Sequence, residues 1–281
     1  MKTHKKDLPV LIAALGLLVV SVFVFPKIFP GFGGVAPKKE LVEPKFPTQL
    51  EVPVLMYHYV EYNQDERDFL RDSLNIVPHV FEAQIETFKD AGYTFITPQE
   101  LPGLFADSSL AEQSMGQGAD QKYVILSFDD GYEDFYTDVL PILKKHNVKA
   151  VNYIVSNFIG RLNYMKAWQI EEVIESGLVE LGCHTANHWG LPGLEETVAF
   201  AEISESKKYL EDEFGVEVTS FAYPYGAYDA DVVELVKRAG FTNAVTDDLG
   251  VVILRDKLFE IPRVRPGYNV GEDLLGYLEK L

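Results

Sequence analysis

Three short polar segments of this sequence carry the residue types that metal-dependent hydrolysis needs. Two adjacent carboxylates occur in residues 128–131 (FDDG), two imidazoles in residues 184–188 (HTANH), and a tyrosine-rich turn in residues 223–226 (YPYG). Adjacent carboxylates repel each other unless a cation or a proton lies between them. Two histidines and one carboxylate form a tridentate set that leaves positions open for water and substrate. Together the segments predict a divalent-metal site that activates water and polarises a carbonyl group.

Each of these segments follows an apolar run that predicts a buried strand. Residues 122–128 (KYVILSF) lead to the carboxylates, residues 179–183 to the histidines, and residues 219–223 to the turn. Polar groups at the ends of buried strands are costly unless they are paired. We therefore expect the three segments to converge on one site.

The alternation of a strand sets which of these side chains can meet. Asp129 and Asp130 point to opposite faces, so they can share a site only if the chain turns at the flexible Gly131. By the same alternation, Cys183 points away from His184. We interpret this cysteine as a small buried apolar residue and not as a metal ligand.

Strand and helix patterns alternate along the body of the chain, which predicts a parallel α/β fold with right-handed crossovers. An open doubly wound sheet and a (β/α) barrel both fit this alternation. A nucleotide-binding open sheet has a glycine-rich turn after its first strand, which is missing from the early turns here. The chemistry of a barrel gathers at the carboxyl ends of its strands, as the polar segments do. The predicted strands are 52–59, 93–97, 122–128, 150–155, 179–183, 219–223, 241–245 and 259–264; the predicted helices are 80–91, 133–146, 166–176, 195–214, 229–239 and 271–281; and 62–74 and 105–121 are predicted as a loop and an insertion.

The composition excludes several classes of function. The chain has 281 residues, a formal net charge of −18, 47% hydrophobic residues and a single cysteine. This length and apolar content suffice for a folded core. One cysteine cannot form an intramolecular disulfide framework or a cysteine-based zinc cluster. The acidity argues against nucleic-acid binding, because no basic field attracts phosphate.

The N-terminal segment differs from the rest of the chain in charge and hydropathy. Residues 1–39 contain six lysines and one acidic residue, and residues 10–25 are almost wholly apolar. We interpret residues 1–9 as a basic cytoplasmic tail, 10–30 as a transmembrane anchor, 31–50 as a linker and 51–281 as one domain. This predicts a single-pass protein of the cell membrane whose domain lies outside the cytoplasm. A cleaved signal peptide, which would release the domain, is the alternative.

The motifs resemble those of a known family. Residues 127–131 (SFDDG) together with 184–188 (HTANH) are similar to the motifs of NodB-type polysaccharide deacetylases, carbohydrate esterase family 4, within a similarity that covers about residues 52–268. The resemblance implies a distorted (β/α)7 barrel. It also implies a divalent metal, usually zinc. Two histidines and one aspartate also suit cobalt, nickel or manganese, so these metals are the alternatives.

Roles for individual residues follow from the same resemblance. It implies that Asp130, His184 and His188 hold the metal. It makes Asp129 the general base that deprotonates the attacking water. It makes Tyr225 the residue whose backbone N–H helps to stabilise the oxyanion.

Two parts of the family pattern are missing here. The arginine that many members carry shortly before the Pro-Tyr turn is absent from residues 221–223 (FAY), and no histidine follows His188. Residues 53–58 (PVLMYH) resemble the opening strand of a branch that includes poly-N-acetylglucosamine deacetylases. That resemblance makes His58 the candidate general acid, with a hydrogen-bonded core histidine as the alternative. Arg263 is the candidate partner of Asp129, with a plain structural ion pair as the alternative.

From these motifs we expect a metal-dependent deacetylase that removes N-acetyl groups from N-acetylglucosamine-containing polysaccharide. An O-acetyl esterase acting on xylan-type glycans and a non-catalytic glycan-binding module on the same fold are the alternatives. The expected partners are the polysaccharide and, through the N-terminal anchor, the membrane. The sequence leaves the identity of the glycan and the oligomeric state open.

Overall fold

The computed structural model describes residues 46–63, 67–106 and 121–281. The predicted basic tail, the predicted anchor and most of the predicted linker lie outside these residues, as does most of the insertion predicted at 105–121. Among the residues that the structure describes, no helix is long and apolar enough to cross a membrane. The membrane anchor therefore stays a prediction from the sequence.

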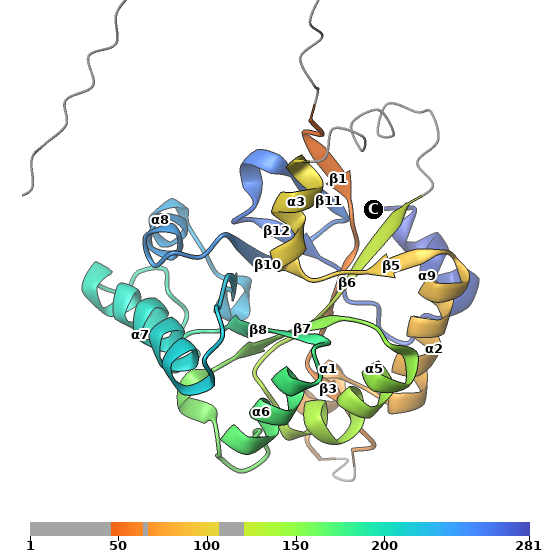
Figure 1. Cartoon of the computed structure of the whole chain (residues 1–281), viewed down its shortest axis with the longest axis horizontal. Coiled ribbons are helices and arrows are strands. Elements are labelled where there is room, and N and C mark those ends of the chain that lie inside the picture. Colours follow the sequence, from red (N-terminus) through yellow and green to blue (C-terminus); the bar gives the residue numbers. More distant parts are fainter. Residues whose placement is uncertain (1–45, 64–66, 107–120) are drawn as a thin grey trace, which may run out of the picture. The chain divides into compact units, whose positions relative to one another are not determined.

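Parallel strands form the centre of the domain (Figure 1). Each strand pairs in parallel with the next along a path from β2 to β12. The two end strands also meet, because the N–H of Met56 donates to the Val264 carbonyl at 2.9 Å and the N–H of Val264 donates to the Val54 carbonyl at 2.8 Å. The sheet is thus a nearly closed α/β barrel and not the open sheet that the alternation also allowed. In order, its strands are β2 (Val54–Tyr57), β6 (Lys122–Phe128), β7 (Ala150–Ile154), β8 (Val179–Cys183), β9 (Ser220–Ala222), β10 (Asn243–Leu249) and β12 (Ile261–Arg263).

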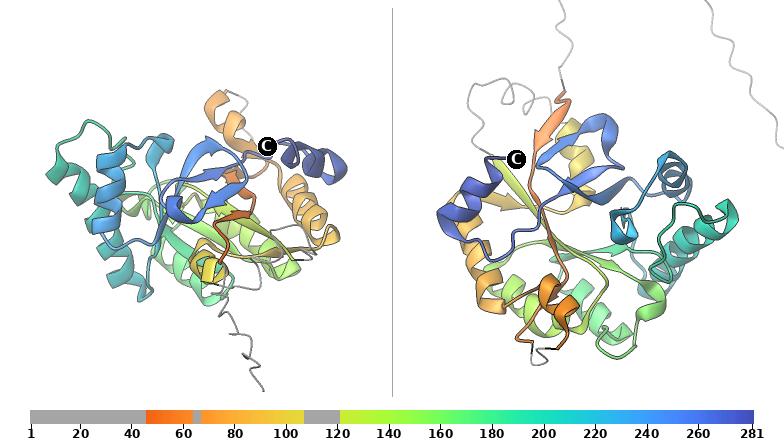
Figure 2. Two further views of the ribbon diagram at one scale, coloured as in Figure 1. Left: turned by 90° about the horizontal axis from the view of Figure 1, so that it is seen from above. Right: turned by 180° about the vertical axis from the view of Figure 1, so that it is seen from behind.

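Helices surround the strands, with α7 beside α8 and α2 beside α9 (Figures 1 and 2). Their apolar faces pack on the outward-pointing strand residues, as where the Phe81 ring of α2 meets the Phe128 ring of β6 edge to face at 5.5 Å. Burial of such faces is the main stabilising contribution to this fold. The helices are α2 (Pro78–Asp90), α5 (Leu140–His146), which follows the π-helical turn η2 (Phe135–Val139), α6 (Ala167–Glu175), α7 (Glu196–Phe214), α8 (Ala230–Arg238) and α9 (Gly271–Leu278).

The amino-terminal end of the barrel is closed by the segment η1–α3, which comprises η1 (Pro98–Glu100) and α3 (Leu101–Ala106). Leu101 and Phe105 join an apolar cluster with alternate strand residues such as Ile125 and Val151. The backbone N–H of Gln99 donates to the Glu180 carboxylate of β8 at 3.0 Å. The opposite end, at the carboxyl ends of the strands, is here called the barrel mouth, and it carries all three of the polar segments.

Several elements differ from the sequence-based expectation. The predicted loop at 62–74 contains the helix α1 (Phe69–Leu74), whose first turn is capped by the Asp68 side chain accepting from the Arg71 N–H at 3.0 Å. The short strands β3 (Tyr59–Val60) and β4 (Asn75–Ile76) pair beside it. β10 extends to Leu249, four residues beyond its predicted end at 245. Two strands that were not predicted, β1 (Gln49–Glu51) and β11 (Val252–Leu254), pair in antiparallel fashion. The strand predicted at 93–97 is present as β5 (Tyr93–Phe95) and pairs with the first half of β6.

Candidate active site

The turns at the barrel mouth have an unusual backbone. Among the described residues, six non-glycine residues have positive φ, and four of these belong to the three polar segments: Asp130 (73°), Thr185 (66°), His188 (59°) and Tyr225 (60°). A left-handed backbone is disfavoured for residues with a Cβ, and such residues cluster at functional sites. The left-handed turn at Asp130 interrupts the strand alternation immediately after Asp129. Both carboxylates can therefore serve the same site.

The side chains of Asp130, His184 and His188 converge at the mouth, and their ligand atoms all lie within 4.8 Å of one another. The Asp130 Oδ1 atom is 3.3 Å from His188 Nε2 and 3.7 Å from His184 Nε2. The two Nε2 atoms are 3.1 Å apart. Two imidazoles and one carboxylate at this spacing fit a divalent metal with open coordination positions.

The protonation of the two histidines suits that role. Burial lowers the pKa of both His184 and His188, so the neutral imidazoles are favoured. His184 Nδ1 lies 2.7 Å from the Ala222 carbonyl oxygen, which can only accept a hydrogen bond. The proton of a neutral His184 is therefore on Nδ1, and Nε2 keeps the lone pair that a metal ligand uses.

Asp129 forms a bidentate ion pair with Arg263. The two guanidinium nitrogens lie 2.8 Å and 2.9 Å from the two carboxylate oxygens, and both side chains are almost wholly buried. Burial acts to raise the pKa of Asp129, but the charge of Arg263, with smaller contributions from His184 and His58, outweighs it and holds this pKa well below its usual range. Asp129 is therefore an ionised carboxylate, which is the form that a general base requires. His58 Nε2 lies 3.9 Å from its Oδ2 atom.

Asp247 takes part in this arrangement although no sequence motif pointed to it. Its Oδ1 accepts from Arg263 at 2.9 Å and its Oδ2 from Arg265 at 3.3 Å. It also lies against Gly226, where an added Cβ would come within 2.4 Å of the Asp247 Cβ. Asp247 thus joins Arg263 to the turn that holds Tyr225. The only signal in the sequence was an acidic pair after an apolar run, which resembles a loop.

Tyr225 lies in η4 (Pro224–Gly226), next to the three ligands. Its ring meets the His188 ring edge to face, with the centroids 4.5 Å apart, while 70% of the residue stays exposed. The resemblance implies that the Tyr225 N–H helps to stabilise the oxyanion, and the turn that carries this N–H is adjacent to the candidate metal group.

The loop between the two histidines is held by α7. The Glu202 carboxylate accepts from the backbone N–H of Asn187 at 2.8 Å and from its side-chain amide at 2.6 Å. The Glu202 carbonyl accepts from the Ala186 N–H at 3.0 Å, and the Ser206 hydroxyl donates to the Thr185 carbonyl at 2.9 Å. Glu202 was also missed from the sequence, although its spacing from the buried Ala199 and Leu210 places it on the inner face of the helix.

Comparisons with known proteins agree with this geometry. A family model described as polysaccharide deacetylase matches residues 116–244, a range that includes both of the motifs on which the resemblance rested. The chain carries a polysaccharide deacetylase domain.

Individual relatives of this polysaccharide deacetylase domain extend the match. YxkH of Bacillus subtilis, named for the same family, is 29% identical over 233 residues, which cover 82% of this chain and 77% of the relative. The poly-beta-1,6-N-acetyl-D-glucosamine N-deacetylase of Staphylococcus aureus is 26% identical over 217 residues, 71% of this chain and 72% of the relative. The structure of the Streptococcus pyogenes deacetylase PplD in complex with acetate matches with a TM-score of 0.70 and 28% identity, covering 82% of this chain and 99% of the other.

The family predicted from the two motifs is thereby confirmed, and so is its class: the homologues are hydrolases that act on N-acetyl amide bonds. The deacetylase domain brings all seven of the predicted site residues to the barrel mouth: Asp129, Asp130, His184, His188, His58, Arg263 and Tyr225. The role of each residue stays a prediction.

Proposed function

We propose that this protein is a metal-dependent N-deacetylase of N-acetylglucosamine-containing polysaccharide. The observation that carries the proposal is the pairing of two groups. A His-His-Asp set fits a divalent metal, and a separate ionised carboxylate, Asp129, stands beside it in a bidentate pair with Arg263. A module that only binds glycan has no need of such a carboxylate. The relatives named as poly-N-acetylglucosamine deacetylases support the choice of substrate.

The metal proposed for Asp130, His184 and His188 is a divalent cation, zinc in the first place, with cobalt, nickel and manganese as the other candidates. A cation bound there would lower the pKa of a water molecule and polarise the acetyl carbonyl.

The residues of the chain itself supply the proton transfers. Asp129 accepts a proton from the attacking water, using a carboxylate lone pair that Arg263 leaves free. The N–H of Tyr225 donates to the oxygen on which negative charge develops. His58 then donates a proton to the departing amine; its place beside Asp129 supports this role, with Nε2 3.9 Å from Oδ2.

Arg263 and Asp247 set the orientation of the base. Asp247 and the Thr246 carbonyl, the latter at 2.8 Å from Nε, fix the Arg263 guanidinium, and Arg263 in turn fixes both oxygens of Asp129. This preorganisation keeps the carboxylate in one position while the proton moves.

The proposed location is the outer side of the cytoplasmic membrane, with the domain tethered through residues 10–30. The lysines before the apolar run support this orientation. Protease added to intact cells should digest the domain. In untreated cells, the chain should remain associated with the membrane. A domain that stays protected until the cells are broken would disprove the location.

The decisive experiment measures acetate release by the full chain from three substrates: β-1,6-linked and β-1,4-linked N-acetylglucosamine oligomers, and acetylated xylan. We expect release from an N-acetylated oligomer, loss of release with a chelator, and recovery on adding zinc. Asp129→Asn should lower kcat by roughly 100- to 10,000-fold while the metal content stays unchanged. Release from acetylxylan alone would indicate the O-acetyl esterase. Tight glycan binding without release under any metal would indicate the binding module.

A further inference from the structure

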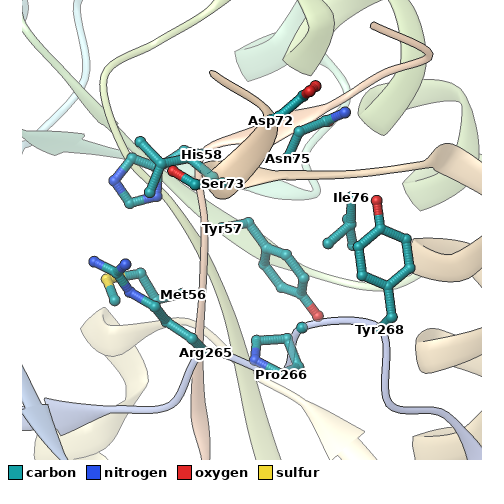
Figure 3. Close-up of a pocket in the computed structure, with 12 residues that line it drawn as sticks. Met56, Tyr57, His58, Asp72, Ser73, Asn75, Ile76, Arg265, Pro266 and Tyr268 are labelled. Atoms are coloured by element: carbon teal, nitrogen blue, oxygen red, sulfur yellow. The ribbon is translucent and has the colours of Figure 1, made fainter. Parts of the chain in front are cut away.

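A cavity of about 150 Å³ opens at the barrel mouth beside His58. Figure 3 shows His58 and Arg265 on one side of it and Tyr268 on the other, with the Tyr57 ring between them. Three segments far apart in the sequence form its walls: the end of β2, the α1–β4 segment and the loop after β12. The lining residues are Met56, Tyr57, His58, Asp72, Ser73, Leu74, Asn75, Ile76, Arg265, Pro266, Gly267 and Tyr268. We name it the His58 pocket.

One wall of the His58 pocket is fixed by a buried side chain. Gln84 of α2 is fully buried and accepts from the Tyr57 hydroxyl at 2.9 Å. Its amide donates to the carbonyls of Gly267 at 2.8 Å and Asn269 at 2.9 Å. These bonds hold the loop after β12 against the end of β2.

The opposite wall is fixed in the same way. The buried Asn75 of β4 donates to the Glu61 carbonyl and accepts from the Glu61 N–H, both at 3.1 Å. Glu61 in turn pairs with Arg71 of α1. Because both walls are held by internal hydrogen bonds, the pocket is formed before any ligand enters, which reduces the cost of binding.

The chemistry of the lining divides into two parts. The floor is apolar and largely buried, with Tyr57 and Ile76 less than a tenth exposed. The rim carries hydrogen-bonding side chains, and the Tyr268 ring there is 59% exposed. A sugar ring has the complementary form, with apolar C–H faces that pack on aromatic rings and hydroxyl edges that need polar partners.

The size and the position of the pocket define its occupant. Pockets for drug-sized ligands measure about 300–1,000 Å³, so a cavity about half the smaller size takes one ring and not an oligosaccharide. His58 lines this pocket and also lies 3.9 Å from Asp129. Arg265, on the same side as His58, shares Asp247 with Arg263. A ring in the pocket is therefore next to the unit whose acetamide reaches the candidate metal group.

We propose that the His58 pocket binds the sugar unit adjacent to the one that is deacetylated, in the same polysaccharide chain. This inference rests on the proposed function for the identity of the reacting unit. It adds that the enzyme recognises at least two consecutive units, so longer substrates gain binding energy that a monosaccharide does not.

The test compares a tetrasaccharide with the monosaccharide of N-acetylglucosamine, using the full chain. Tyr268→Ala removes the exposed ring and should raise KM for the tetrasaccharide about 3- to 10-fold, with kcat little changed. The kcat/KM for the monosaccharide should stay at the wild-type value. Ser73→Trp, which fills the pocket from α1, should act in the same direction. Tyr209→Ala, at an exposed tyrosine of α7, is the matched control and should leave kcat/KM unchanged for both substrates.

A binding measurement keeps this test independent of activity. Calorimetric titration of the tetrasaccharide into Asp129→Asn protein should show weaker binding once Tyr268→Ala is added. If the wild-type chain releases no acetate but this loss of binding is seen, the proposed function fails, and the His58 pocket stands only as a sugar-binding site. If the wild-type chain is active but Tyr268→Ala and Ser73→Trp affect both substrates equally, or neither, the subsite is disproved and the proposed function stands.

Discussion

Among the residues that the structure describes, two groups of side chains have the composition of a metal site, and they differ in burial and backbone conformation. The first is Asp130, His184 and His188 at the barrel mouth. The second, Glu82, Glu86 and His146, lies on the outer surface where α2 meets the end of α5. In both groups the ligand atoms lie within 4.8 Å of one another.

Their environments separate the two groups. At the surface, Glu82 Oε1 already lies 2.6 Å from Lys145 Nζ and 2.7 Å from His146 Nε2, and Glu86 is exposed. At the mouth, the three ligands lie on turns that contain left-handed residues, and α7 holds the loop that carries His184 and His188. Ligand types and distances alone therefore do not define a site; burial and an imposed backbone conformation distinguish the mouth group.

The largest expected difference between the groups is in metal content. His184→Ala should abolish stoichiometric zinc binding and acetate release, because two remaining ligands bind zinc far more weakly than three. Glu86→Ala should leave both unchanged. Metal analysis of each purified, dialysed full-length variant measures the effect. A protein that lost its metal with Glu86→Ala and kept it with His184→Ala would reverse the assignment.

Buried and exposed ion pairs of the domain should differ as strongly in their contribution to stability. Arg263→Gln leaves Asp129 and Asp247 without their buried cation and should lower the free energy of unfolding by about 3–5 kcal/mol. The exposed pair of Arg238 with Glu196, at 2.6 Å, is the matched control, and Arg238→Gln should cost less than about 1 kcal/mol. Urea denaturation of each variant measures both values.

The pH dependence of that difference has a defined sign. The folded pKa of Asp129 is depressed, so its pair with Arg263 contributes stability above the usual carboxyl pKa, and this stability is lost as pH falls toward the folded value. The cost of Arg263→Gln should therefore be greatest near neutral pH and smaller near pH 3, below the usual carboxyl pKa. A cost that grows on acidification would show that Asp129 is not ionised in the wild-type protein.

The sequence predicts the parts of the site that depend on short-range pattern. The apolar run before residues 128–131 and the spacing in residues 184–188 predicted where the carboxylates and histidines lie. The strand β6 has the predicted bounds 122–128. A buried strand and a motif at its end are local properties, so they can be recognised without knowing what packs against them.

The contributions of Asp247 and Glu202 could not be found in this way. Asp247 is at the barrel mouth because β10 continues past 245 to pair with β12, a contact that depends on barrel closure. Glu202 lies on the inner face of a helix that also carries many exposed charges, but its contact with the Asn187 loop depends on the tertiary fold. Both residues act through tertiary contacts that hydropathy patterns do not encode.

Glu202 provides a smaller and more specific test of the mouth group. Glu202→Ala leaves the Asn187 N–H without its partner and should weaken zinc affinity about 10- to 100-fold, with a smaller loss for Glu202→Gln, which keeps one acceptor oxygen. Glu205→Ala, on the exposed face of the same helix, is the control. Competition of the metal-free protein with a fluorescent zinc chelator measures affinity directly. Equal zinc affinities in all three variants would show that α7 does not position the histidines.

The smallest effect is expected at the surface group, where Glu82 is paired but remains close to solvent. Hydrogen bonds from Lys145 and His146 lower the pKa of Glu82, so the pair stabilises the fold above the usual glutamate pKa and this contribution is lost as pH falls. Glu82→Gln should therefore cost about 0.2–1 kcal/mol at pH 7 and almost nothing near pH 3. Added salt should shrink the cost further, because exposed charges are screened. Denaturation at two salt concentrations measures this. A salt-insensitive cost of several kcal/mol would mean that the surface group behaves as a buried pair, and the contrast with Arg263 would no longer hold.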